Sequence, residues 1–77
     1  SGKSLLAAGI KKVNGNFSKG DHIRILNKDM MEFARGLSSF TSDEISIIKG
    51  QHSNKISSLL GYETKSEVIH KDDMVKV

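Results

Sequence analysis

The sequence contains no cysteine, no proline and no tryptophan in its 77 residues. The lack of cysteine excludes a disulfide framework and a cysteine-based zinc site, and it fits a reducing compartment such as the cytoplasm. No run approaches the ~20 apolar residues of a membrane-spanning helix, and the first residues lack the apolar run of a signal peptide. We therefore expect a cytoplasmic domain that does not contact a membrane and is held together by its core alone.

The chain is also too short to offer much room for an enzyme site. A single domain of 77 residues buries only about two-thirds of its unfolded surface, which leaves little for a deep substrate cleft. Its 36% hydrophobic and 27% charged residues, without a long block of one charge, are typical of a globular domain and not of a disordered chain. We expect one folded domain over residues 1–77.

Positive charge is in excess, +3 overall, and it is gathered in the first part of the chain. Residues 1–28 contain six lysines or arginines and one aspartate, a net +5, whereas six cations and eight acids give the rest of the chain −2. Such asymmetry is typical of a surface that faces a polyanion, although lysines on small domains are mostly plain solvated side chains. The candidate phosphate contacts are Lys11, Lys12, Lys19, Arg24 and Arg35.

Periodicity predicts strands in the first half of the chain. Residues 9–15 and 21–27 alternate apolar and polar side chains and flank a turn-rich stretch, which indicates two strands and a loop. A third strand is expected over residues 31–40, where the interior Gly36 indicates a bulge or a sharp bend. The connection at 27–31 lacks the Asn-Gly or Asp-Gly of a tight hairpin, so we expect a longer or less regular turn.

Two short helices are predicted after these strands. Thr41 and Glu44 have the spacing of a capping box, and Gly50 supplies a left-handed stop. The second helix is expected to be capped by Ser53 and to end at Gly61. The fold class is therefore mainly β with short helices (α+β).

The end of the chain is predicted to be extended, and the two helices before it leave one alternative fold open. Residues 66–77 indicate two short extended pieces separated by a turn at 71–73. The two helices alone permit a helix-turn-helix whose second helix, with Ser53, Asn54 and Lys55, enters the major groove of DNA. Only one cation lies on that helix and its predicted neighbours are strands, so this alternative is the less favoured.

Candidate catalytic and metal-binding groups are few. Residues 2–4 match the end of a phosphate-binding loop, but the first glycine and the strand that build the phosphate cradle do not precede them. His70, Asp72 and Asp73 are residue types that bind divalent ions. The favoured interpretation of this group is an ordinary turn whose side chains bond to the local backbone.

Four stretches resemble a known family, namely GNFSKGD at residues 15–21, ARGL at 34–37, LGY at 60–62 and EVIHKDD at 67–73. With GKSLL ahead of them, they are similar in order and spacing to the carboxy-terminal PUA domain of glutamate 5-kinase, which phosphorylates glutamate at the start of proline biosynthesis. The resemblance runs nearly end to end. It assigns GKSLL to a segment that leads into a PUA strand and not to a phosphate-binding loop.

The resemblance implies a strand-rich, PUA-like pseudo-barrel without the family's first strand and helix, which precede GKSLL. It implies no catalytic residue, because the glutamate and ATP sites of the family belong to the kinase domain. ATP and magnesium are therefore cofactors of that domain, and none is expected for this chain. PUA domains are similar to modules that bind structured RNA in RNA-modifying enzymes, so structured RNA and the parent kinase domain are the expected partners.

Two departures from the family pattern affect the backbone. Ala7 stands where the family usually has proline, so φ is less restricted there. Met30 and Met31 stand where a glycine is usual near the hairpin tip. Two functions stay open at this point: an RNA-binding module that uses the candidate phosphate contacts, and a structural or regulatory appendage. The appendage would pack on the kinase domain or on another subunit through Met30, Met31 and Phe17.

Overall fold

The structure is a computed structural model that describes residues 3–77. Gly2, which belongs to the tripeptide that matches the end of a phosphate-binding loop, lies outside the described residues. Within 3–77 the strands are β1 (Leu5–Leu6), β2 (His22–Leu26), β3 (Glu32–Leu37), β4 (Glu67–Ile69) and β5 (Met74–Lys76). The α-helices are α1 (Ser42–Ile48) and α2 (Ile56–Leu60), and short 3-10 turns span Ala7–Gly9, Ser53–Lys55 and Lys71–Asp73. The predicted class, mainly β with short helices, is confirmed.

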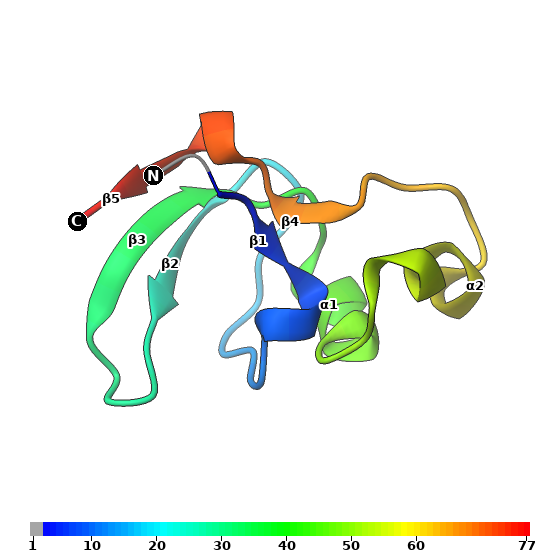
Figure 1. The fold of residues 1–77 in the computed structure, drawn as a ribbon, viewed down its shortest axis with the longest axis horizontal. Helices are drawn as coiled ribbons and strands as arrows, with labels where there is room; N and C mark the ends of the chain where they lie inside the picture. The colour runs from blue at the N-terminus through cyan, green and yellow to red at the C-terminus, as the bar shows by residue number, and fades with distance from the viewer. Residues whose placement is uncertain (1–2) are drawn as a thin grey trace.

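The strands form two antiparallel sheets. One sheet has the order β2-β3-β5, and the other consists of β1 and β4. In Figure 1 the three-stranded sheet lies at one end of the molecule, the two α-helices lie at the other, and β1 and β4 lie between them. The predicted turn at 71–73 is confirmed, and it carries the chain from β4 in the small sheet to β5 in the larger one.

The β2–β3 hairpin has the irregular turn that the sequence predicts. Met30 has a φ of +64°, a left-handed conformation at a position where the family usually has glycine nearby. The Asn27 side-chain oxygen accepts hydrogen bonds from the backbone N–H groups of Asp29 and Met31, at 2.9 and 3.1 Å. This side-chain turn replaces a glycine turn as the support of the tip.

The predicted strand over residues 9–15 is wrong. Ala7–Gly9 form a 3-10 turn that the N–H of Ile10 closes by donating to the carbonyl of Ala7, and the following residues have no regular structure. Ile10 and Val13 are half-buried against the core, but they lie three positions apart, which is not the period of two that a strand requires. The strand in this part of the chain is β1, which pairs with β4.

The first helix begins and ends as predicted. The Thr41 hydroxyl accepts from the N–H of Glu44 at 3.1 Å, and a carboxylate oxygen of Glu44 accepts from the N–H of Thr41 at 2.8 Å. This is the capping box, which satisfies two backbone donors that a helix leaves free. The chain leaves the helix through Gly50, which has a φ of +77°.

The predicted cap of the second helix, Ser53, is wrong, because Ser53 lies inside the 3-10 turn that precedes α2, and Lys55, directly before α2, makes no side-chain cap bond. His52, not Ser53, precedes the turn, and its Nδ1 accepts from the N–H of Asn54 at 3.3 Å. The following 3-10 turn continues directly into α2, which ends at Gly61 as predicted, with a φ of +86°. None of the described helices is long and apolar enough to cross a membrane.

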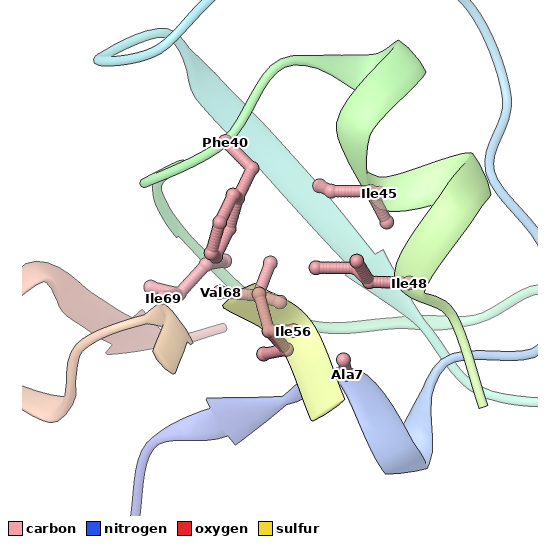
Figure 2. Close-up of a cluster of buried hydrophobic side chains, with 7 residues drawn as sticks. All are labelled: Ala7, Phe40, Ile45, Ile48, Ile56, Val68 and Ile69. Atoms are coloured by element: carbon pink, nitrogen blue, oxygen red, sulfur yellow. The ribbon is translucent and has the colours of Figure 1, made fainter. Parts of the chain in front are cut away.

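The core lies between the β1–β4 pair and the two helices, as Figure 2 shows. Phe40 follows β3 and is 1% exposed, and Val68 and Ile69 on β4 are fully buried. The N–H of Ser39 donates to the carbonyl of Val68 at 2.8 Å, which fixes the chain beside Phe40 against β4. The complete cluster consists of Ala7, Phe40, Ile45, Ile48, Ile56, Val68 and Ile69.

A buried carboxylate connects the first helix to the segment that follows the second. The Tyr62 hydroxyl donates a hydrogen bond to Glu44, whose side chain is 11% exposed. Burial raises the pKa of Glu44 most strongly, but hydrogen bonds from Tyr62 and Thr41 and the charge of Lys19 together outweigh it, so the pKa lies below its ordinary value. The pKa of Tyr62 is raised, chiefly by its hydrogen bond to Glu44.

Gly36 on β3 packs closely against Ile69 of β4 and against the 71–73 turn. A Cβ on Gly36 would lie 2.5 Å from the carbonyl oxygen of Asp73 and 2.7 Å from Cγ2 of Ile69. The sequence predicts a bulge or a sharp bend at Gly36, but the β2–β3 register is regular there and shifts instead between Ile25 and Leu26. The close packing is what requires a glycine at this position. A side chain would have to displace backbone here, not the flexible end of another side chain.

We expect Gly36→Ala to lower the free energy of unfolding by about 1 to 3 kcal/mol, because the added methyl group forces β3 away from the 71–73 turn. Chemical denaturation of the variant measures this. Gly9→Ala is the matched control, since a Cβ at Gly9 meets nothing within 4 Å. Equal stability of both variants and the parent chain would show that the sheets do not depend on this contact.

We expect Tyr62→Phe to reduce stability in acid. Because the pKa of Glu44 is depressed in the folded state, its interactions stabilise the fold above about pH 4.3, the ordinary range of glutamate, and are lost as pH falls through the folded pKa. Removing the Tyr62 hydroxyl raises that pKa, so the acid unfolding midpoint moves to higher pH. A pH titration followed by circular dichroism tests this, with Glu63→Gln as the control, and an unmoved midpoint contradicts it.

Candidate nucleic-acid interface

The outer face of the three-stranded sheet carries the two predicted arginines side by side. Over the regular part of the pairing, residues 23–25 of β2 and 34–36 of β3, the side chains alternate between a buried or half-buried inner face and an exposed outer face. The pairing is irregular between Ile25 and Leu26, where Phe33 has no partner on β2. The register places Ile23 opposite Gly36 on the inner face and Arg24 opposite Arg35 on the outer face. Directly opposite residues have Cβ atoms about 4.5 to 5.5 Å apart. Both guanidinium groups therefore project from one patch of exposed sheet.

This arrangement is electrostatically costly unless an anion compensates it, because like charges directly opposite on a sheet destabilise the pairing. Glu32 compensates Arg35, since its carboxylate lies 2.8 Å from Nε of that residue. Within the described residues, Arg24 has no carboxylate within 4 Å. Guanidinium groups bind phosphate with a planar, two-pronged geometry, so the pair is a candidate site for a phosphate group.

The predicted lysines do not join this arginine pair on the sheet. Lys11 and Lys12 are exposed on the irregular segment that follows the first 3-10 turn, because the predicted strand there does not form. Lys19 lies in the loop ahead of β2, and its ammonium group is 3.9 Å from the buried carboxylate of Glu44. Of the five candidate phosphate contacts, only Arg24 and Arg35 are brought together by the pairing of two strands.

Two aromatic side chains are exposed enough to stack on a base. Phe33 on β3 is 49% exposed and Tyr62 is 47% exposed, although the Tyr62 hydroxyl is engaged with Glu44. Phe40 is 1% exposed and Phe17 packs against the core cluster, so neither is available for stacking. Phe33 lies where the pairing of β2 and β3 is irregular, so strand alternation does not assign it to the outer face with Arg35.

Sequence reasoning missed a second group of cations. Lys3, Lys71 and Lys76 line one hollow beside the inner face of the three-stranded sheet. Lys3 lies near one end of the sequence and Lys71 and Lys76 near the other, so no local motif indicates that the three lie together. The one signal in the sequence is the alternation of β5, which assigns Lys76 to the opposite face from Val75.

The group of His70, Asp72 and Asp73 forms a turn. The Nδ1 atom of His70 accepts from the N–H of Asp72 at 3.1 Å, so the histidine, and not an aspartate, makes the local backbone bond. Within residues 3–77 no three His, Asp or Glu side chains converge as a metal site.

The helix-turn-helix alternative does not fit the structure. The second α-helix spans only Ile56–Leu60, and Lys55 belongs to the 3-10 turn before it. The core contains strand residues Val68 and Ile69 where such DNA-binding domains use a third helix.

The comparisons with known proteins agree with the fold. The sequence profile of the PUA domain family matches residues 1–60. The chain is 69% identical over 76 residues to the glutamate 5-kinase of Pelagibacter ubique (strain HTCC1062), covering 99% of this chain and 21% of that protein. It is 49% identical over 74 residues to the glutamate 5-kinase of Microcystis aeruginosa (strain NIES-843 / IAM M-2473), covering 96% of this chain and 20% of that protein.

The chain thus spans about a fifth of the length of the curated relatives that it matches. The similarity to them is continuous over nearly all of this chain and includes the segment 15–21, the sheet strands and the two helices. The family profile covers most of the same residues. The chain belongs to the PUA domain family.

Proposed function

We propose that this chain is a non-catalytic, cytoplasmic PUA domain of a glutamate 5-kinase and that it binds structured RNA through the outer face of its three-stranded sheet. The observation that carries the proposal is the exposed pair of Arg24 and Arg35 on adjacent strands. ATP and magnesium belong, in this proposal, to a kinase domain. The role in proline biosynthesis is that of the kinase as a whole.

The arginine pair favours RNA over a small anion because the cations are not confined to one point. Lys11 and Lys12 add charge on a separate exposed segment, and the net charge is +3. A nucleic-acid backbone carries phosphates along its length, so separate basic groups on one small domain contribute together. Helical RNA is recognised largely through its shape and its phosphates, which requires few base-stacking side chains.

Binding to an RNA hairpin should be weak and strongly dependent on salt. With about three or four phosphate contacts, log affinity falls against log salt with a slope of roughly −2 to −4. Arg24→Ala combined with Arg35→Ala should flatten that slope by about 1.5 to 2, whereas Lys55→Ala leaves it unchanged. Fluorescence anisotropy at several salt concentrations measures the slopes. A folded chain that binds no structured RNA at low salt rules the proposal out.

A second candidate function is an appendage that packs on the kinase domain, and the hairpin tip favours it. Met30 and Met31 are each 64% exposed at the end of the β2–β3 hairpin. Unbranched methionine side chains adapt to irregular apolar surfaces and are frequent in protein interfaces. Phe17, which the sequence suggested as a third contact, is half-buried in the core and cannot contribute to that surface in full.

If the tip docks on the kinase domain, we expect Met30→Ser with Met31→Ser to weaken association of this chain with a separately produced kinase domain by about tenfold or more. The reason is that the interface loses two apolar side chains that it would bury. Isothermal calorimetry measures the change. RNA binding of the same variant should remain as in the parent chain. Unchanged association with the kinase domain would show that the hairpin tip is not a docking site.

A further inference from the structure

A hollow of about 370 Å³ lies beside the inner face of the three-stranded sheet. Its apolar part includes Ile25 on β2, Phe33 on β3 and Met74 on β5. Phe33 is 49% exposed, and Ile25 and Met74 are only half-buried against the core. In this region the inner face of the sheet is therefore not fully covered by the rest of the described chain. We call this hollow the β5 groove.

The charged part of the β5 groove is entirely basic. Lys3, Lys71 and Lys76 line it, and no aspartate or glutamate is among the described residues that do so. The Ser4 hydroxyl accepts from the N–H of Lys71 at 2.9 Å, which holds the segment of Lys3 beside the 71–73 turn. Three cations around one apolar floor attract a ligand that is both acidic and apolar.

The groove is bordered by a free sheet edge. Within residues 3–77, β5 pairs with a strand on one side only, that of β3. The N–H of Val77 donates to the carbonyl of Phe33 at 3.1 Å, so by the alternation of an antiparallel ladder the backbone groups of Lys76 point away from β3. The N–H of Met74 is already used by the carbonyl of Lys71. The N–H of Lys76 is therefore the donor that the edge offers to an added strand.

We propose that the β5 groove binds an extended acidic segment of a protein partner, which pairs with the free edge of β5. In an added strand every second side chain points to the inner face, where the groove lies. If three successive inward-facing residues of the added segment are acidic, apolar and acidic, the apolar side chain would lie against Phe33 and Met74. The carboxylates would then lie among the lysines.

The apolar residues of the β5 groove and the free edge of β5 favour a peptide over single-stranded nucleic acid. Nucleic acid would also satisfy the three lysines, but its bases bind chiefly by stacking on aromatic side chains. Phe33 is the one aromatic residue among the described residues that line the groove. Nucleic acid would also leave the N–H of Lys76 without the carbonyl partner that an added strand supplies.

A synthetic peptide with the alternation Thr-Glu-Thr-Ile-Thr-Glu-Thr is the probe. Fluorescence anisotropy with this chain should show saturable binding that weakens as salt is raised. A peptide with lysine in place of both glutamates should not bind. Amide chemical shifts in the labelled chain should move along β5 and at Phe33, while those of α2 should stay constant.

Matched variants separate charge from strand pairing. Lys71→Glu with Lys76→Glu should weaken peptide binding by at least about tenfold. Lys76→Ala removes one charge, and Lys76→Pro removes the same charge together with the edge N–H. The proline variant should therefore bind about three- to tenfold more weakly than the alanine variant. Arg24→Ala with Arg35→Ala should leave peptide binding unchanged, because that pair lies on the outer face.

Three results would overturn the proposal. One is the absence of saturable binding by a chain whose circular dichroism shows it to be folded. The second is equal binding of the acidic and lysine peptides. The third is displacement of the acidic peptide by a single-stranded oligonucleotide that binds more tightly, with shift changes at the same residues. The first two leave the RNA proposal for the outer face untouched, since that proposal is tested by other variants.

Discussion

The contact between Gly36 and the 71–73 turn determines how the two sheets meet. Because Gly36 has no side chain, the carbonyl of Asp73 and the side chain of Ile69 lie directly against the backbone of β3. The chain that leaves β4 can therefore turn sharply and pair with β3 as β5, in the register that sets Met74 opposite Gly36. A larger residue would push β5 outward and separate the small sheet from the large one.

That register also decides which cations share a surface. With Met74 opposite Gly36, Lys76 lies opposite Ala34 and faces the inner side, and Val75 lies opposite Arg35 on the outer side. The two faces of the three-stranded sheet thus carry basic surfaces of different chemistry. The outer surface presents planar guanidinium groups, which match phosphate. The inner surface presents flexible ammonium groups around an apolar floor, which match carboxylates on an apolar segment.

The features that the sequence predicts correctly depend on neighbouring residues. The capping box of α1, the glycine stops after both helices and the β2–β3 hairpin each follow from residues a few positions apart. The predicted strand at 9–15 failed because its apolar residues have a spacing of three. The histidine caps were missed because histidine is not a usual capping residue. The groove lysines were missed because only sheet pairing and the bond between Ser4 and Lys71 bring them together.

Two features of the β2–β3 hairpin are locally unfavourable: the left-handed backbone of Met30 and the pairing of Arg24 with Arg35. Neighbouring contacts offset the cost of the first more fully than that of the second. The left-handed backbone of Met30 costs about 1 to 2 kcal/mol, but two hydrogen bonds to the Asn27 side chain support the turn around it. The juxtaposed arginines are compensated on one side only, by the contact of Glu32 with Arg35. Departures from local consistency without compensation are typical of functional sites. In the RNA-binding proposal, Arg24 is therefore the residue whose presence is attributed to surface chemistry and not to stability.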